Sequence, residues 1–143
     1  MIVFGTNVLS EMMRPAHDSS VLNWLNTQVA GELWLNSVVV SELLFGIARL
    51  PAGARKRQLT DTFAAMLEQD FAGRIPPFDL EAAVIYAELA AGCEATGRPL
   101  AMAKGQIAAI CLAQGAKLAT RNLKHFGGLG LVLVNPWEVA DGR

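Results

Sequence analysis

The amino-acid sequence predicts an α/β fold, a three-layer sandwich in which helices flank a mainly parallel central sheet. Four short apolar runs have the length of buried strands, and they lie at residues 1–4, 33–36, 117–120 and 131–134. Segments with a helical spacing of apolar side chains separate these runs, and this alternation is typical of a parallel sheet with helical crossovers. The chain has 143 residues, which is the length of one average domain, so we expect a single domain over residues 1–143.

Two helices are predicted between the first and second strands. A short helix follows the first strand, with Thr6 or Asn7 as its expected N-cap, because short polar side chains accept hydrogen bonds from the first free N–H groups. The next helix is expected to begin with Ser19 or Ser20 as its cap and to end before Gly31.

Two further helices follow the second strand. One begins at Ser37 and ends before Pro51, and a longer amphipathic helix covers residues 54–71. Residues 75–78 are extended and carry two prolines, so they predict a poor strand or an edge strand.

The last third of the chain predicts two long helices and the last two strands. Asp79 is the expected cap of a helix over residues 80–96, and a further helix covers residues 102–114. Gly115 ends that helix, and residues 121–130 are predicted to form a turn-rich loop between the strands.

Composition and charge exclude several classes of protein. Hydrophobic residues make up 52% of the chain and charged residues 17%, which excludes intrinsic disorder and suggests that a partner covers some apolar surface. The 12 basic and 13 acidic residues give a net charge of −1, which argues against binding nucleic acid by bulk electrostatics but allows local contacts. Neither a long apolar span nor a signal-peptide pattern is present, so we expect a cytoplasmic protein with no membrane partner.

The two cysteines do not form a recognisable metal or redox motif. Cys93 and Cys111 lie in separate apolar, alanine-rich stretches, without a neighbouring cysteine or histidine at ligand spacing. We expect both to be packed free thiols.

Polar side chains follow three of the predicted strands. They lie at residues 5–7, 37–42 and 121–122. Because ligand sites in such sheets form beyond the carboxyl ends of the strands, we expect these side chains to meet at one edge.

Several blocks of sequence together resemble the PIN domain, in particular its VapC/FitB type, the toxin of a toxin–antitoxin pair. The blocks are residues 1–11, 41–43, 98–109 and 118–122, followed by Phe126 and residues 135–137. The resemblance implies a PIN-like sandwich and an endoribonuclease that depends on Mg²⁺ or Mn²⁺, metals that favour oxygen ligands. It also implies an RNA substrate, a homodimer, and a cognate antitoxin that wraps across the groove.

The chain departs from the family pattern at the acidic positions. Gly5 and Lys104 stand where the family carries aspartates, Asn122 stands where aspartate is common, and His125 occupies a further position that is often acidic. Of the usual carboxylates only Glu42 remains. An ammonium and a divalent ion about 4 Å apart repel by roughly 4 kcal/mol per pair of unit charges at an effective dielectric near 20, so Lys104 is expected to occupy the place of the cation.

The resemblance assigns catalytic roles to Glu42, Asn122, Thr6 and Asn7, and it leaves Glu42 as the only carboxylate ligand for a metal. Thr6 and Asn7 are expected to act first as caps and second to orient groups of the site. For Lys104 two interpretations stay open, namely an ion pair with Glu42 and a side chain that points to solvent.

Three other polar features have simpler interpretations. His125 is expected to be an exposed turn residue and a weak metal candidate. Residues 55–57 are expected to form a solvated helix start, with contact to an RNA backbone as the alternative, and residues 127–130 a turn instead of a phosphate loop.

Two functions are therefore compatible with the sequence. The first is a ribonuclease toxin whose activity is impaired or lost through Gly5 and Lys104. The second is a non-catalytic binder that keeps the fold, dimerises and sequesters an antitoxin.

Overall fold

Four short parallel strands form the centre of the computed structural model, which describes residues 1–138. Their order across the sheet is β2-β1-β3-β4. The strands are β1 (Ile2–Phe4), β2 (Leu33–Trp34), β3 (Lys117–Ala119) and β4 (Leu133–Val134). The helices are α1 (Thr6–Met12), α2 (Ser19–Asn26), α3 (Ser37–Ala48), α4 (Ala54–Gln69), α5 (Leu80–Ala95), α6 (Met102–Gln114) and α7 (Leu123–Phe126), with a 3-10 turn at Ala30–Glu32.

The parallel α/β prediction is confirmed, and β1 is the strand on which the others assemble. Val3 pairs with Trp34 of β2 on one side and with Leu118 of β3 on the other. Val3 and Phe4 are fully buried, because a parallel strand in the middle of a sheet is covered on both faces.

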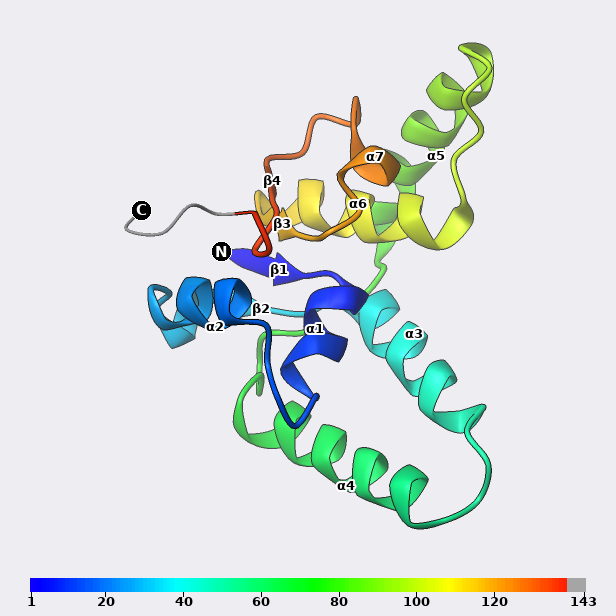
Figure 1. Ribbon diagram of the computed structural model, residues 1–143. Helices are drawn as coiled ribbons and strands as arrows, with labels where there is room; N and C mark the ends of the chain where they lie inside the picture. The colour runs from blue at the N-terminus through cyan, green and yellow to red at the C-terminus, as the bar shows by residue number, and fades with distance from the viewer. Residues whose placement is uncertain (139–143) are drawn as a thin grey trace.

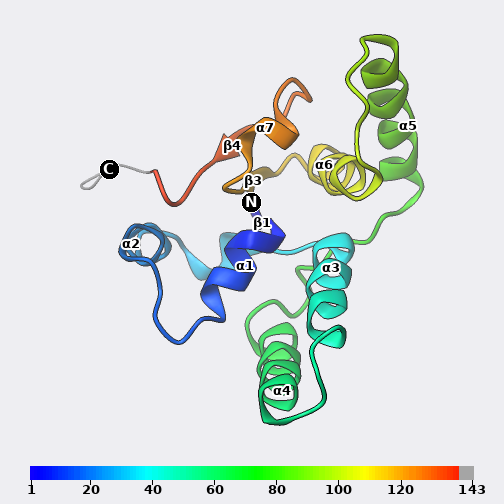
Figure 2. The same ribbon diagram turned by 45° about the vertical axis from the view of Figure 1, so that its right-hand side comes forward.

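Helices lie on both sides of the strands. In both views α5 and α6 lie together beside the β3–β4 half of the sheet, and α3 and α4 lie together beside the β2 half (Figures 1 and 2). Figure 2 shows α2 across the strands from α3 and α6. The core between these layers includes an aromatic group in which the Phe4 ring lies 5.9 Å from the Trp24 ring and 6.1 Å from the Phe71 ring, centroid to centroid.

The long helices of the second half begin and end close to the predicted residues. The Asp79 side chain accepts a hydrogen bond from the Ala82 N–H at 3.0 Å and caps α5. Gly115 ends α6 in the left-handed conformation, with φ 65°, which glycine adopts without a steric penalty.

The predicted caps of the first two helices were wrong. Gly5 occupies the N-cap position of α1, so Thr6 and Asn7 belong to its first turn. Asp18, one residue before the expected serines, caps α2 by accepting hydrogen bonds from the N–H groups of Ser20 and Val21.

Two predicted loop or strand segments also differ from the structure. Residues 121–130 contain the short helix α7, so His125 is exposed on a helical turn. Residues 75–78 are extended without being assigned as a strand. The Ser37 N–H donates to the Pro76 carbonyl at 3.1 Å, but the two prolines have no N–H with which to continue the pairing.

Both cysteines are free thiols, as the sequence predicts. Cys111 is buried within α6 and Cys93 is half-buried on α5. Burial raises the pKa of the Cys111 thiol to about 12. Within residues 1–138 no helix combines the length and the apolar character that a membrane crossing requires.

The close packing of α5 against α6 depends on Gly105. A Cβ at this position would lie 2.7 Å from Cε1 of Tyr86 and 2.9 Å from Cδ2 of Leu100. We expect Gly105→Ala to destabilise the protein by about 1–3 kcal/mol, because overpacking outweighs the roughly 1 kcal/mol that alanine gains in a helix. Gly92→Ala, on exposed α5 surface with no atom within 4 Å, is the matched control and should be neutral or stabilising. Denaturant unfolding measures both; equal stability of the two variants would contradict the packing argument.

Candidate active site

A polar cleft of about 1130 Å³ opens beyond the carboxyl ends of β1 and β3, between α1, α3 and α6. The structure brings the residues singled out in the sequence together here: Gly5, Thr6, Asn7, Glu42, Lys104 and Asn122 all line the cleft. The convergence expected from the parallel sheet is therefore present. His125 lies outside this cleft, in a smaller neighbouring pocket.

Glu42 is held in the cleft by a hydrogen bond from α1. The Thr6 hydroxyl donates to Oε1 of Glu42 at 2.6 Å, and Glu42 is half-buried on α3. A short bond to an ionised acceptor is stronger than a neutral one, so it restricts the carboxylate to one orientation. The expected orienting role of Thr6 is thus realised between two helices that the sequence separates by 36 residues.

Asn7 and Thr120 shape the turn after β3. Oδ1 of Asn7 accepts a hydrogen bond from the Arg121 N–H at 3.4 Å, and Oγ1 of Thr120 accepts one from the Asn122 N–H at 3.0 Å. Both side chains therefore accept hydrogen bonds from backbone N–H groups of this turn. Asn122 is exposed at the cleft surface.

Lys104 does not form the ion pair with Glu42 that was one of its two predicted arrangements. It is half-buried in the first turn of α6, and its Nζ lies 5.6 Å from the centroid of the Phe126 ring, a cation–π arrangement. It does not pair with Glu42, because the ion pairs among residues 1–138 join Met1 to Glu32 and Arg14 to Glu11. Its ammonium group therefore remains in the cleft without a carboxylate partner.

Gly5 is closely enclosed by the neighbouring strand. A Cβ at this position would lie 3.1 Å from the Ala119 carbonyl oxygen, whereas its backbone, with φ −69° and ψ 166°, suits any residue. A larger side chain fits here only if the β3 backbone shifts by a few tenths of an ångström.

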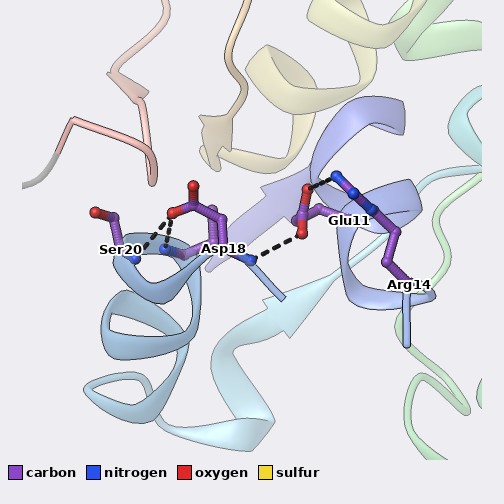
Figure 3. Close-up of polar contacts among 5 residues, drawn as sticks. Glu11, Arg14, Asp18 and Ser20 are labelled. Carbon is purple, nitrogen blue, oxygen red and sulfur yellow. Dashed lines mark hydrogen bonds and ion pairs between the residues drawn. The ribbon is translucent and has the colours of Figure 1, made fainter. Parts of the chain in front are cut away.

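Glu11 is a second carboxylate that lines the cleft, and the sequence did not single it out. Figure 3 shows its contacts with Arg14 and Asp18. Its Oε1 accepts from Nη1 of Arg14 at 3.3 Å, and its Oε2 accepts from the Asp18 N–H at 3.0 Å. Its side chain is only 6% exposed, so both oxygens serve to fix the segment between α1 and α2. The sequence gives little indication of this role, because the bond to Asp18 depends on how the chain turns after α1.

The donor atoms of the cleft do not fit a divalent metal ion. Glu42 offers one oxygen that is not already bonded to Thr6, and both oxygens of Glu11 are engaged. In the described part of the chain, no three histidine, cysteine, aspartate or glutamate side chains gather closely enough to hold a metal. The unpaired Lys104 ammonium adds repulsion, so the cleft lacks the crowded carboxylates that Mg²⁺ or Mn²⁺ needs.

The cleft is instead basic. Among residues 1–138, five basic side chains line it against two acidic ones, namely Glu11 and Glu42. The basic residues are Arg14, Arg49, Arg55, Lys104 and Arg121. Arg55 is exposed, as expected for a solvated helix start, and it also lines the cleft. Clustered cations surrounded by low-dielectric walls attract anions even on a chain whose net charge is −1.

An aromatic face lies beside these cations. The guanidinium carbon of Arg121 lies 4.8 Å from the centroid of the Trp137 ring, and both side chains line the cleft. Arginine stacked on an aromatic ring beside a basic groove is a surface that suits the bases and phosphates of a single nucleic-acid strand.

The chain has a four-stranded parallel sheet with a cleft at the carboxyl ends of its strands, and the polar side chains of Glu42 and Asn122 line this cleft. These features define its class of fold. The family model of the PIN domain matches residues 2–126, and the chain belongs to the PIN domain family.

Characterised relatives match along nearly the whole chain. The chain is 40% identical to VapC ribonuclease Y4jK of Sinorhizobium fredii over 140 residues, which cover 98% of this chain and 100% of that protein. It is 35% identical to Toxin FitB of Neisseria gonorrhoeae over 138 residues, which cover 96% and 99% of the two chains. Among solved structures, FitAB bound to the IR36 DNA fragment contains a chain that matches at a TM-score of 0.90 and 33% identity, with 100% of both chains covered.

The stability of the protein without metal should reflect the missing carboxylates. In chelator, we expect the double variant Gly5→Asp/Lys104→Asp to have a lower melting temperature than the double variant Gly5→Asn/Lys104→Asn, whose side chains have the same shape without the charge. The reason is that added carboxylates beside Glu42 repel one another. The asparagine variant carries the same steric strain at position 5, so the difference isolates charge. Mg²⁺ should raise the melting temperature of the aspartate variant alone, since only that variant gains a metal site. Identical melting curves in chelator would contradict the proposed crowding of charges.

Proposed function

We propose that this chain is the toxin-type member of a toxin–antitoxin pair, built on the scaffold of a metal-dependent endoribonuclease, and that its cleavage of RNA is lost or strongly reduced. The observation that carries this proposal is the composition of the cleft. Among residues 1–138, Glu42 is the one carboxylate of the cleft with a free oxygen, and Lys104, which has no ion-pair partner there, lines the same cleft.

The family supports the assignment to a toxin–antitoxin pair. One relative is named a VapC ribonuclease and another is named Toxin FitB. A solved structure that this chain resembles is that of FitAB bound to a DNA fragment. Because the chain matches these proteins over nearly its full length, a partner antitoxin is the natural inference for this chain as well.

The cleft side chains suit binding of RNA better than its hydrolysis. Lys104 and Arg121 offer positive charge to phosphate oxygens, and Trp137 offers a face on which a base can stack. Glu42, oriented by Thr6, and the exposed Asn122 can accept or donate hydrogen bonds to sugar hydroxyls. Mg²⁺ or Mn²⁺, the cofactor of the family, is expected to bind this chain weakly, so no hydrolytic step is assigned to these residues.

The antitoxin is proposed to cover the apolar part of the cleft formed by α3 and α4. Phe45 of α3 lines this part of the cleft and is 63% exposed. Large aromatic side chains that are exposed in the free protein are frequent anchors of interfaces. Lys104 would repel an arginine that the antitoxin inserted into the cleft, which weakens the complex relative to that of an acidic site.

A second copy of the chain is proposed to cover α5. Leu80 and Val84 lie one helical turn apart on this helix and expose 81% and 56% of their surfaces. Burial of such a face in a symmetric dimer would also explain why only 17% of the residues are charged.

The decisive measurement is cleavage of single-stranded RNA in the presence of Mn²⁺. We expect the protein to cleave at a rate about 100-fold or more below that of Gly5→Asp/Lys104→Asp, because loss of ligands costs more than the 10–100-fold typical of outer-shell changes. The neutral Gly5→Asn/Lys104→Asn variant is the control and should stay inactive. Cleavage by the unchanged protein at the rate of the aspartate variant would contradict the proposal.

The same assay separates the two candidate functions. If restoring both aspartates restores activity, the chain is a ribonuclease toxin inactivated at its metal site. If the aspartate variant binds Mn²⁺ and still does not cleave RNA, the chain is better described as a non-catalytic binder of the antitoxin. The single available carboxylate of the cleft also favours this second function.

A further inference from the structure

A second pocket of about 310 Å³ shares the lining residue Lys104 with the cleft. It is formed by the segment before α6 and by α7 with the loop after it. Lys104 lines both hollows, so the smaller pocket adjoins the cleft.

The lining of this pocket is strongly basic. It contains Arg98, Lys104, Lys124 and His125, and no acidic side chain among residues 1–138 lines it. None of the four forms an ion pair with another residue between positions 1 and 138. Within the described part of the chain, the cleft and the pocket together gather seven lysine and arginine residues and two acidic ones.

Such a cluster of like charges raises the free energy of the folded protein unless an anion neutralises it. Guanidinium and ammonium groups that converge on one hollow match the geometry of phosphate oxygens. The size of the pocket, at the lower end of the range for ligand sites, suits one phosphate group with its attached sugar.

Arg98 is already held in position for this role. Its Nη2 donates to the Gly127 carbonyl oxygen at 3.3 Å, and its Nη1 lies 3.4 Å from the place a Cβ of Gly128 would occupy. Gly128 has φ 79°, which only glycine adopts easily, so the loop approaches the guanidinium closely. A guanidinium has five N–H donors, and this one bond leaves others that can face a ligand.

We propose that this pocket binds a phosphate group of an RNA strand whose neighbouring nucleotides lie in the cleft, and that it does so without a divalent ion. Lys104 connects the two hollows and supplies positive charge where the family has a metal ligand. This inference rests on the proposed function, since it takes RNA as the strand that enters the cleft.

The first test measures binding of a fluorescent eight-nucleotide RNA in chelator, with and without a 5′-phosphate, by anisotropy at several salt concentrations. We expect Lys124→Gln to weaken binding about tenfold and to reduce the slope of log affinity against log salt by about 0.7. Lys117→Gln is the matched control, because Lys117 is also exposed but lies at the amino end of β3, away from both hollows. Its affinity should stay within about twofold of the unchanged protein.

The two RNA probes distinguish an internal phosphodiester from a terminal phosphate. A loss with both probes assigns an internal phosphate to the pocket, and a loss confined to the 5′-phosphorylated probe assigns the terminal one. Equal affinity and equal salt slope of Lys124→Gln and Lys117→Gln would overturn the proposal while leaving RNA binding in the cleft intact.

A second measurement keeps the pocket testable if RNA does not bind at all. Titration with inorganic phosphate should shift the backbone amide NMR signals of Lys124 and His125 in the unchanged protein and shift them less in the Lys124→Gln variant. If phosphate shifts these signals but the RNA probes do not bind, the pocket is a phosphate site whose natural ligand is not RNA. Unmoved signals would reject the pocket as a phosphate site.

Discussion

The pairing of β1 with β3 is the constraint on which the rest of the molecule depends. The ladder continues one residue beyond β1, where the Gly5 N–H donates to the Ala119 carbonyl at 2.8 Å. This bond sets the ends of both strands side by side, so that Asn7 after one strand reaches the turn after the other. The same closeness leaves little room for a side chain at position 5. The close approach of Gly5 to the Ala119 carbonyl therefore both holds the two strands together and limits which side chain can stand at position 5 in the cleft.

The charge of the cleft depends on which charged side chains lie at the carboxyl edge of the sheet. A site with several carboxylates is stabilised by cations, whereas a site with one available carboxylate and a set of arginines and lysines is stabilised by anions. Thr6 orients Glu42 in this cleft by a hydrogen bond. A fold can carry different sets of charged side chains at the same sheet edge, which is why the fold alone does not decide the activity.

Local sequence patterns predicted the elements whose boundaries depend on local chemistry. Asp79 and Gly115 bound long helices that periodicity alone indicates, and both were predicted correctly. The cap of α2 was misplaced because residues 18–20 are three consecutive cap-forming side chains, and only the path of the chain selects Asp18. Helix α7 was missed because four residues are too few for a periodic pattern.

Properties that arise between distant segments were harder to predict. The convergence of Thr6, Glu42 and Asn122 was predictable from the rule that the ends of parallel strands share one edge. The position of Lys104 over Phe126 was not, because it depends on where α7 packs against α6. The basic cleft was hidden by a net charge of −1, since its cations come from residues spread between positions 14 and 121.

The presence of Lys104 in the lining of both hollows also has an evolutionary consequence. Because one side chain faces both, its replacement by aspartate changes the charge of each hollow by two units at once. A lineage that acquired an acidic residue at position 104 would make the smaller pocket less favourable for anions at the same time. The two properties are therefore inherited together, and selection can improve one independently of the other only through residues that line a single hollow, such as Gly5 or Lys124.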